Sequence, residues 1–405
     1  MKDNINYNLI SPKNGKVDKV FASKILKPFD DIAVEFISEL SKKILKDNKL
    51  KNFPELVSMA FWMRKSHILS IKNEFFDKKK DRVWLARGTA FHIAPSNVDT
   101  IFIYSWFLSL LVGNKNIIRI SQSNNEQLDI LIQIIDELSS KDKFKAIKDR
   151  FLIITYEHNK DITEFFSKQC DIRVIWGGDN TINTIRSIPI KPTAIELSFA
   201  DKFSIAVINS NFMLQNLNKK NKLYENFYND SFWFDQQACS SPKLVCWVGD
   251  QESVVKAKKE FWNGVTKIYQ KKFDDFSSSR AMDKMVATYS LAIENDKILI
   301  DNNPLIQTVQ LDNHKSISRN LHCGAGLFYE LTLNKIDELG DFILKKDQTI
   351  GIYGFEKKNI IDFISKTLPD GVDRIVSIGK MMDFSLVWDG HDLTREFCRE
   401  INIDL

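Results

Sequence analysis

Residues 82–121 read RVWLARGTAFHIAPSNVDTIFIYSWFLSLLVGNKNIIRIS and contain a strand, a helix and a second strand in succession. Arg82–Ala94 is expected to form one or two strands, and Asn116–Ser121 a short buried strand. Between them, Thr100–Val112 is apolar and of helical length, and Gly113 ends it. A strand, a helix and a strand of these lengths indicate neighbouring parallel strands in one sheet.

The same alternation continues along most of the chain, after a lysine-rich first hundred residues with a helical pattern. Glu126–Ser139 carries apolar residues on one helical face, and Ile172–Trp176 is a strand followed by two glycines. Further strands are expected at 150–156, 194–199, 204–209, 243–248, 305–311, 327–333, 349–353 and 374–378. Further helices are expected at 161–170, 179–187, 251–271, 280–295, 336–346 and 357–368. The pattern predicts an α/β protein of two domains, with the polar segment Asn216–Asp230 as a connection between them.

The composition is that of an ordinary globular protein. The chain has 405 residues, of which 43% are hydrophobic and 27% charged, and its formal net charge is +4. No basic stripe with interleaved aromatic residues is present, which disfavours nucleic-acid binding. The polar start Met1–Asn4 lacks the apolar core of a signal peptide. The longest apolar run, Ile101–Val112, would span only about 18 Å as a helix, whereas a bilayer needs about 30 Å. We therefore expect a cytoplasmic protein without a membrane span.

The cysteines do not form a disulfide or metal-binding pattern. The five cysteines are irregularly spaced, odd in number and without a C-x-x-C motif, which favours a reducing compartment. His314 and the His322-Cys323 pair lack metal-ligand spacing, so no metal site is expected.

One cysteine lies in a loop rather than in a predicted core element. Asp235–Lys243 reads DQQACSSPK, so Cys239 is flanked by small and polar residues, whereas Cys246 lies inside an apolar strand. Loop cysteines can be activated as nucleophiles by nearby cations or helix N-termini. Position alone leaves two interpretations of Cys239 open, a catalytic nucleophile and an ordinary loop thiol.

Candidate ligand-binding residues lie in or after three of the predicted strands, near the strand ends where α/β sheets place ligands. Asn97 comes after the first strand, as a helix N-cap or as an amide donor. Arg119 lies in an otherwise apolar strand and needs a partner, for which a nucleotide phosphate or ribose is a candidate. Gly177 and Gly178 lie between a strand and a helix, where they permit close approach of a phosphate or form an ordinary tight turn. Asp179 counts slightly against a phosphate there.

Taken in order, these segments resemble the LuxC-type acyl-CoA reductases, the fatty acid reductases of bacterial luminescence systems. That family is a branch of the aldehyde dehydrogenase superfamily. The matching segments, in chain order, are 91–97, 113–114, 117–121, 176–179, 199–204, 235–242, 348–351, 373–376, 383–385 and 388–390. Each motif is weak by itself, but the ordered set is specific and covers about residues 80 to 395.

The resemblance implies an aldehyde dehydrogenase-like α/β fold with a Rossmann-like nucleotide-binding domain and an α/β catalytic domain. On this basis residues 1–210 are expected to hold an N-terminal helical segment and the NADP-binding domain. Residues 211–375 are expected to be the catalytic domain that carries the cysteine. Residues 376–405 are expected to return to the nucleotide domain or to an oligomer interface.

The resemblance also implies an activity, the reduction of an acyl-CoA thioester to an aldehyde with NADPH. Cys239 is then the nucleophile, and the side chain of Asn97 with the Cys239 backbone N–H holds the oxyanion. Arg119 and Ser121 match positions on the adenosine side of the cofactor. Trp176, Gly177 and Gly178 match the turn beside its phosphates. The implied partners are an acyl-CoA substrate, an acyl-protein synthetase and further copies of the chain.

One departure from the superfamily concerns water activation. Oxidising members carry a glutamate–leucine–glycine–glycine motif whose glutamate activates water, and here the segment from Glu196 to Lys202 reads ELSFADK. If Lys202 is the anchor, Ser198 takes the glutamate position. Loss of that base suits a reductase, but the sequence leaves the role of Glu196 and the acyl group open. Two alternatives also stay open, an acyl-phosphate reductase of the same superfamily and a non-catalytic nucleotide-binding or interaction module.

Overall fold

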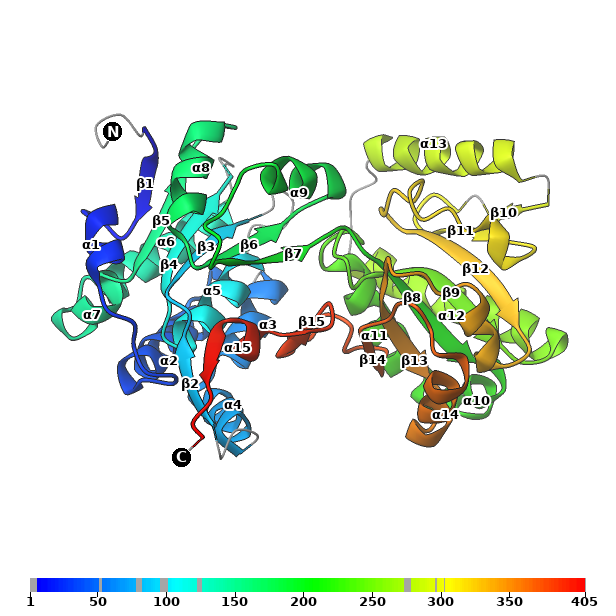
Figure 1. Cartoon of the computed structure of the whole chain (residues 1–405). Helices are drawn as coiled ribbons and strands as arrows, with labels where there is room; N and C mark the ends of the chain where they lie inside the picture. The colour runs from blue at the N-terminus through cyan, green and yellow to red at the C-terminus, as the bar shows by residue number, and fades with distance from the viewer. Residues whose placement is uncertain are drawn as a thin grey trace. The chain divides into compact units, whose positions relative to one another are not determined.

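The computed structural model describes residues 6–50, 53–77, 82–94, 101–121, 126–272, 278–295, 297–301 and 303–404. The chain forms two compact units (Figure 1). Unit 1 consists of residues 1–201 and 384–405, and unit 2 consists of residues 202–383. The sequence-based boundaries, after residues 210 and 375, lie within ten residues of these divisions.

Unit 1 is built on a six-stranded sheet with the order β1-β5-β4-β3-β6-β7. The strands are β1 Asn8–Ser11, β3 Thr89–Ile93, β4 Lys115–Ile120, β5 Phe151–Thr155, β6 Ile172–Trp176 and β7 Ile195–Phe199. All neighbouring pairs are parallel except β1 with β5. Among the parallel strands, the chain starts at β3, moves outward through β4 and β5, then crosses to β6 and β7. In such a doubly wound sheet, ligands bind outside the carboxyl ends of the strands where the order reverses.

Helices cover both faces of this sheet (Figure 1). They are α1 Val17–Ala22, α2 Asp31–Lys46, α3 Pro54–Trp62, α4 Lys65–Asp77, α5 Ile101–Leu111, α6 Glu126–Ser139, α7 Lys145–Lys148, α8 Lys160–Gln169 and α9 Asp179–Arg186, with the 3-10 turn η2 Asp142–Phe144. One face packs Phe91 and Ile93 of β3 against Phe166 of α8. The strands β3, β5 and β6 are buried along their whole length, which fits their mostly apolar sequences.

The last residues of the chain belong to unit 1. They form the hairpin β15 Val387–Trp388 and β16 His391–Asp392, the short helix α15 Leu393–Glu396 and the strand β17 Cys398–Ile401, which pairs antiparallel with β2 Val83–Ala86. The loop of this hairpin, Asp389-Gly390, has φ of 48° and 76°. Positive φ at both central residues fits a two-residue hairpin loop. Phe384 stacks on Tyr104 of α5 with ring centroids 5.1 Å apart, so these aromatic residues are packed rather than merely on the surface.

Unit 2 contains a seven-stranded sheet with the order β10-β11-β12-β9-β8-β13-β14. The strands are β8 Phe203–Asn209, β9 Pro242–Val248, β10 Leu299–Asp301, β11 Gln307–Gln310, β12 Leu327–Leu333, β13 Asp347–Tyr353 and β14 Arg374–Ser377. The helices are α10 Ser210–Gln215, α11 Lys220–Phe232, α12 Gln251–Lys272, α13 Ser278–Glu294 and α14 Lys357–Thr367, with 3-10 turns η3 Leu217–Lys219, η4 His314–Ser316 and η5 Ile336–Asp341. All neighbouring strands are parallel except β10 with β11.

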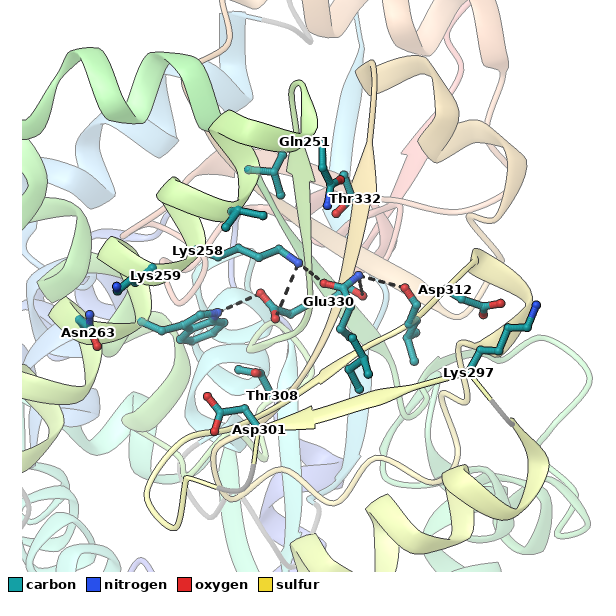
Figure 2. Close-up of a pocket in the computed structure, with 16 residues that line it drawn as sticks. Gln251, Lys258, Lys259, Asn263, Lys297, Asp301, Thr308, Asp312, Glu330 and Thr332 are labelled. Atoms are coloured by element: carbon teal, nitrogen blue, oxygen red, sulfur yellow. Dashed lines mark hydrogen bonds and ion pairs between the residues drawn. The ribbon is translucent and has the colours of Figure 1, made fainter.

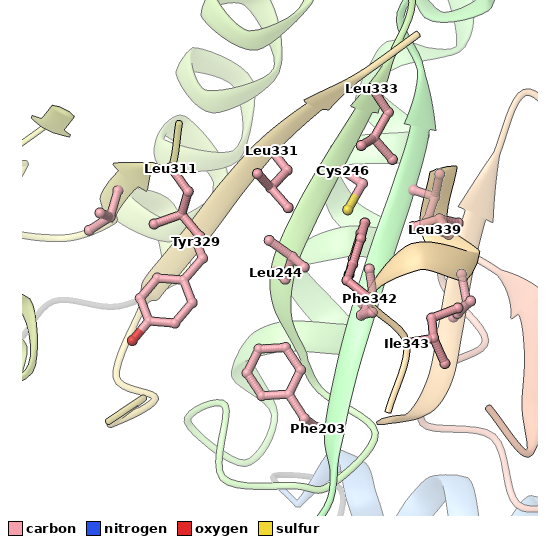
Figure 3. Packing of buried hydrophobic residues seen from close by; sticks show 14 of the residues in the cluster. Phe203, Leu244, Cys246, Leu311, Tyr329, Leu331, Leu333, Leu339, Phe342 and Ile343 are labelled. Atoms are coloured by element: carbon pink, nitrogen blue, oxygen red, sulfur yellow. The ribbon is translucent and has the colours of Figure 1, made fainter. Parts of the chain in front are cut away.

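The sheet of unit 2 has a hydrophobic core on each face. Leu244 and Cys246 of β9 point into the cluster shown in Figure 3, together with Tyr329 of β12. Val245 and Trp247 of β9 point into the opposite cluster. The two-residue period of the strand thus places alternate side chains of one apolar run in two different cores.

Three sequence-based expectations about secondary structure were wrong. The segment Asn216–Asp230 is not a connection, because α11 fills most of it and buries Leu223, Tyr224 and Phe227 against α12. The predicted helix at 336–346 is only the six-residue 3-10 turn η5. The lysine-rich N-terminal part is not purely helical, since it contains the edge strand β1, which pairs with β5, whereas the strands expected within Arg82–Ala94 are confirmed as β2 and β3.

Candidate active site

The side chain of Gln236 holds the loop that carries Cys239 in place. The loop joins the end of α11 to β9, and Asp235 and Gln236 adopt left-handed φ angles of 50° and 62°. The fully buried amide of Gln236 donates to the carbonyl oxygens of Pro242 and Leu327, each at 2.8 Å. Its Oε1 accepts the Gly326 N–H at 2.9 Å. One buried side chain therefore satisfies backbone groups at the start of β9 and at the start of β12.

A second loop, His322–Gly326, supports the first. The Gln237 amide donates to the Cys323 carbonyl at 2.9 Å, and the Ala325 N–H donates to the Asp235 carbonyl at 3.2 Å. Gly324 has a φ of 75°, and a Cβ there would lie 2.6 Å from Nε2 of Gln237. The two loops are therefore matched in shape, and a larger residue at 324 would disturb the Cys239 loop.

Cys239 itself is half-buried and contacts two strands of the sheet. Its carbonyl oxygen accepts the Ser204 hydroxyl of β8 at 2.7 Å. Its Sγ lies 3.5 Å from Nε2 of Gln348 on β13, within hydrogen-bonding range for sulfur. The sequence did not single out Ser204 or Gln348 as site residues. The polar run Asp347-Gln348-Thr349 at the start of an apolar strand was the available signal.

The other cysteines have surroundings that disfavour a thiolate. Burial raises the pKa of Cys170 to about 12 and that of Cys323 to about 11. Burial also raises the pKa of Cys246, which is fully enclosed in the core of Figure 3, as expected from its apolar strand. Cys398 is buried as well. Cys239 therefore combines partial exposure with a polar hydrogen-bond donor at its sulfur.

In unit 1, the predicted cofactor residues lie at the carboxyl ends of the strands around the reversal point. Ser121 follows β4, and Trp176 ends β6, where its ring stacks on Phe199 at a centroid distance of 4.0 Å. Ser121 Oγ and Trp176 Nε1 are buried and have no hydrogen-bond partner among the described residues. Buried polar atoms of native proteins are nearly always paired, so a ligand at this edge would account for both.

The two glycines after β6 differ in their roles. The Gly177 N–H donates to the Phe199 carbonyl at 3.2 Å, and a Cβ on Gly177 would meet Thr181 at 3.1 Å. Gly178 is the N-cap of α9, and a Cβ there would meet nothing within 4 Å. The protein's own packing therefore does not require glycine at 178, and its missing side chain leaves open space at the helix N-terminus.

Arg119 is partly buried on β4 and has no carboxylate at ion-pair distance within the part of the chain that the structure describes. Its guanidinium donates to the Tyr156 carbonyl at 3.2 Å and lies 5.5 Å from the centre of the Tyr156 ring. Burial lowers the pKa of Arg119. Asn97, the predicted oxyanion donor, lies outside the described residues, three positions beyond Ala94 at the end of β3.

Glu196 is fixed in an ion-pair network on β7. The buried guanidinium of Arg173 donates to Oε2 at 2.7 Å, and Arg186 donates to Oε1 at 2.9 Å. Arg186 also donates to the Ser198 hydroxyl at 2.7 Å. Both carboxylate oxygens of Glu196 therefore accept arginine donors.

Unit 2 also contains an open pocket of about 750 Å³ between α12 and the strands β10 to β12 (Figure 2). At its floor, Oε1 of Glu330 accepts the indole N–H groups of Trp247 at 2.7 Å and Trp262 at 2.9 Å. Lys258 lies 3.9 Å from Oε2 of Glu330 and donates to Gln310. Cys239 is not among the residues that line the pocket. The polar groups of the floor pair with one another. Because no residue of the Cys239 loop lines the pocket, the pocket is separate from the cysteine site.

Two further features of the described residues concern metal binding and membrane crossing. Within the described ranges, no three His, Cys, Asp or Glu side chains gather closely enough to hold a metal ion. Of the helices that the structure describes, none has both the length and the apolar character to cross a membrane.

Solved structures match the chain along nearly its whole length. Aldehyde dehydrogenase 21 from Physcomitrella patens, in complex with the reaction product succinate, matches with a TM-score of 0.69 at 9% identity, covering 99% of this chain and 95% of that one. Lactaldehyde dehydrogenase from Escherichia coli matches with a TM-score of 0.60 at 12% identity, covering 92% and 83%. Proline Utilization A from Bradyrhizobium japonicum matches with a TM-score of 0.62 at 11% identity, covering 93% of this chain, which spans only 43% of that protein.

The fold is thus that of the aldehyde dehydrogenase superfamily, and the α/β fold class expected from the sequence is confirmed. The chain belongs to the acyl-CoA reductase (LuxC) family, whose sequence model matches residues 35–399. No curated protein sequence matches the chain. Family and fold together identify an oxidoreductase that acts on aldehyde or acyl groups and imply a nicotinamide cofactor.

Proposed function

We propose that the protein reduces an acyl-CoA thioester, with a long-chain fatty acyl group, to the aldehyde, using NADPH and an acyl-cysteine at Cys239. The observation that carries this proposal is the half-buried thiol of Cys239 with an amide donor at its sulfur. This thiol lies in a chain of the acyl-CoA reductase family, matched over residues 35–399.

In the first step, the Cys239 thiolate attacks the carbonyl carbon of the thioester. A carbon–sulfur bond to Cys239 forms, the bond to coenzyme A breaks, and coenzyme A leaves as a thiolate that takes up a proton. The Asn97 side chain and the Cys239 backbone N–H hold the oxyanion that develops on the carbonyl. One such donor contributes about 3 kcal/mol to the transition state.

In the second step, the acyl group is reduced by two electrons while it stays attached to Cys239. The bound nicotinamide supplies the hydride for this step. With one proton from solvent, the acyl-cysteine becomes a thiohemiacetal. Its collapse breaks the carbon–sulfur bond, gives the hydroxyl proton back to solvent, releases the aldehyde and returns the thiolate of Cys239.

The engaged state of Glu196 supports reduction rather than hydrolysis. A base that activated water would divert the acyl-cysteine to a carboxylic acid. Both oxygens of Glu196 accept arginine donors, and the neighbouring Ser198 carries a hydroxyl rather than a carboxylate. Membership of a family of oxidoreductases fits this arrangement.

We propose that unit 1 binds the nicotinamide cofactor at the carboxyl edge of its sheet. Ser121 and Arg119 would contact the adenosine side, since the first has an unpaired buried hydroxyl and the second lacks a carboxylate partner among the described residues. Trp176, Gly177 and Gly178 would line the phosphates, where Gly178 leaves open space at the N-terminus of α9. A helix N-terminus favours a phosphate there.

The test is an aldehyde-forming assay with hexadecanoyl-CoA, acetyl-CoA and hexadecanoyl phosphate, each with NADPH or NADH. We expect aldehyde from hexadecanoyl-CoA with NADPH, with one coenzyme A released per aldehyde. The Cys239→Ala variant should lose at least about 1,000-fold in rate, as for removal of other enzyme nucleophiles. Cys323→Ala, the matched control on the adjoining loop, should keep the activity. Activity only with the acyl phosphate would favour the acyl-phosphate alternative, and unchanged behaviour of Cys239→Ala would favour a non-catalytic module.

We further propose a cytoplasmic homo-oligomer that can receive its acyl group from an acyl-protein synthetase partner. The membership of the LuxC family supports this proposal. Light scattering of the purified chain, whose single-copy mass is 46.9 kDa, tests the oligomer. A mass of one chain at micromolar concentration would contradict it.

A further inference from the structure

We infer that the side-chain amide of Gln348 is the donor that stabilises the Cys239 thiolate and fixes its position. Nε2 of Gln348 lies 3.5 Å from Sγ of Cys239. Gln348 is only 3% exposed, so its amide group cannot exchange this contact freely for water. The catalytic meaning of the contact rests on the proposed function, but the contact itself does not.

The orientation of the Gln348 amide is set by its neighbour. The hydroxyl of Thr349 donates to Oε1 of Gln348 at 3.2 Å, so this oxygen faces Thr349 in the structure. The NH₂ group then faces the sulfur. An amide flip would place the Gln348 oxygen against the sulfur, where two acceptors would meet once Cys239 is a thiolate.

The same pair of residues also fixes the main chain of Cys239. Ser204 donates its hydroxyl to the Cys239 carbonyl at 2.7 Å and accepts the Thr349 N–H at 3.3 Å. The sulfur and the carbonyl of Cys239 are thus both tied to residues 348–349 of β13. A nucleophile held at two points keeps the geometry that attack on a carbonyl requires.

Charged side chains near this site have partners of their own. Asp347 forms a two-point ion pair with Arg319, with both contacts at 2.7 Å. Lys202 lies 3.6 Å from Asp373, and Arg280 lies 3.0 Å from Asp235. The hydrogen bond to the sulfur comes from a neutral amide, and these charged side chains are engaged with each other.

A donor of this kind changes the acidity of the thiol. Hydrogen bonds to the charged form of an acid stabilise that form and lower its pKa. Because only the thiolate attacks, the reaction rate at neutral pH follows the thiolate fraction. Loss of the Gln348 amide should therefore reduce the reactivity of Cys239 even in the absence of any substrate or cofactor.

The experiment measures the pH dependence of iodoacetamide alkylation at Cys239, followed by peptide mass spectrometry. Gln348→Met keeps the length of the side chain without the donor, and Gln348→Glu replaces the donor by an acceptor. We expect the apparent pKa of Cys239 to rise by about one unit in Gln348→Met, with an alkylation rate at pH 7 about ten-fold lower. Gln348→Glu should raise it further. Gln310→Met, which removes a glutamine amide from the separate pocket of unit 2, should leave the profile unchanged.

The outcomes separate this inference from the proposed function. If the alkylation profile of both Gln348 variants equals that of the parent, the inference is overturned, even if acyl-CoA acylates Cys239. If the profiles shift but no acyl-CoA acylates Cys239, the inference stands and the proposed function fails. Thermal unfolding shows which variants are folded, and either Gln348 variant alone suffices for the comparison.

Discussion

At the residue scale, Glu196 is a carboxylate whose observed contacts are structural ion pairs. Its side chain is 16% exposed and pairs with Arg173, whose own side chain is 3% exposed. The Arg173 guanidinium also donates to the Ser167 hydroxyl at 3.1 Å and the Ile188 carbonyl at 2.8 Å. An ion pair of this kind holds β7 against β6.

We expect Glu196→Gln to destabilise the protein and to leave its catalytic rate nearly unchanged. Removal of the carboxylate leaves the buried charge of Arg173 unpaired, which costs about 3 kcal/mol or more. The measurements are the urea midpoint of unfolding and the rate of aldehyde formation at a temperature where the variant is folded. A loss of rate beyond about ten-fold in the folded variant, which corresponds to about 1.4 kcal/mol, would mean that Glu196 acts in the reaction.

Gly178 gives a second prediction at this scale. Because φ is −68° and a Cβ would meet nothing within 4 Å, Gly178→Ala should leave the thermal midpoint within about 2 °C of the parent. A methyl group at a phosphate site should instead weaken NADPH binding by about ten-fold, which isothermal titration would detect. An unchanged affinity would place the cofactor phosphates elsewhere.

At the element scale, the packing of α11 explains why a polar segment forms a helix. Its apolar and aromatic residues recur at helical spacing among lysines and asparagines, and one face packs against α12. Asp230, near its end, accepts the Gly379 N–H and, at 3.1 Å, the Met381 N–H. The helix thereby holds the turn that follows β14.

The carboxyl of Asp230 makes the stability of unit 2 depend on pH. Burial raises the pKa of Asp230 from 3.8 to about 7, although its two backbone donors act in the opposite direction. The folded protein therefore keeps a proton between pH 4 and 7 that the unfolded chain has released. Its contribution to stability is complete below pH 3.8 and is lost as the pH rises through about 7.

We expect Asp230→Asn to gain stability relative to the parent as the pH rises from 5 to 8. The gain is at most about 3 kcal/mol, because each unit of pKa shift corresponds to 1.36 kcal/mol. Urea unfolding at both pH values measures the difference, and Asp362→Asn, at an exposed position of α14, is the control. A difference that stays constant with pH would show that Asp230 is charged throughout this range.

Sequence patterns predicted the regular elements better than the short or irregular ones. The bounds of α6, β6 and β12 agree with the sequence-based ranges, since α6 has a clear helical period and the two strands are mostly apolar. The edge strands β1 and β10 were missed because three or four residues carry no measurable period. The helix α11 was missed because its polar residues outnumber the apolar ones that its packing uses.

The candidate site was only partly predictable for a topological reason. Cys239 could be proposed from its small, polar neighbours, whereas Gln348 lies 109 positions further along the chain. The two meet because β13 lies next to β8, which in turn lies next to β9. That order of strands is not sequential, and no local pattern reveals it.

At the scale of the whole molecule, the chain builds two α/β units, and unit 2 is inserted into unit 1 between residues 201 and 384. Each unit buries its own hydrophobic core. We propose that unit 1 binds the cofactor and that unit 2 forms the covalent intermediate. Acylation of Cys239 needs the thioester but no hydride, so it can be observed before any cofactor is added.

The most direct measurement is therefore intact mass spectrometry after addition of hexadecanoyl-CoA without NADPH. We predict the addition of one acyl group per chain, located on Cys239 by digestion, and its discharge as aldehyde when NADPH is added. Cys239→Ala should show no addition, and Cys323→Ala should behave as the parent. Acylation of Cys323 instead, or no acylation of a folded protein, would contradict the central claim.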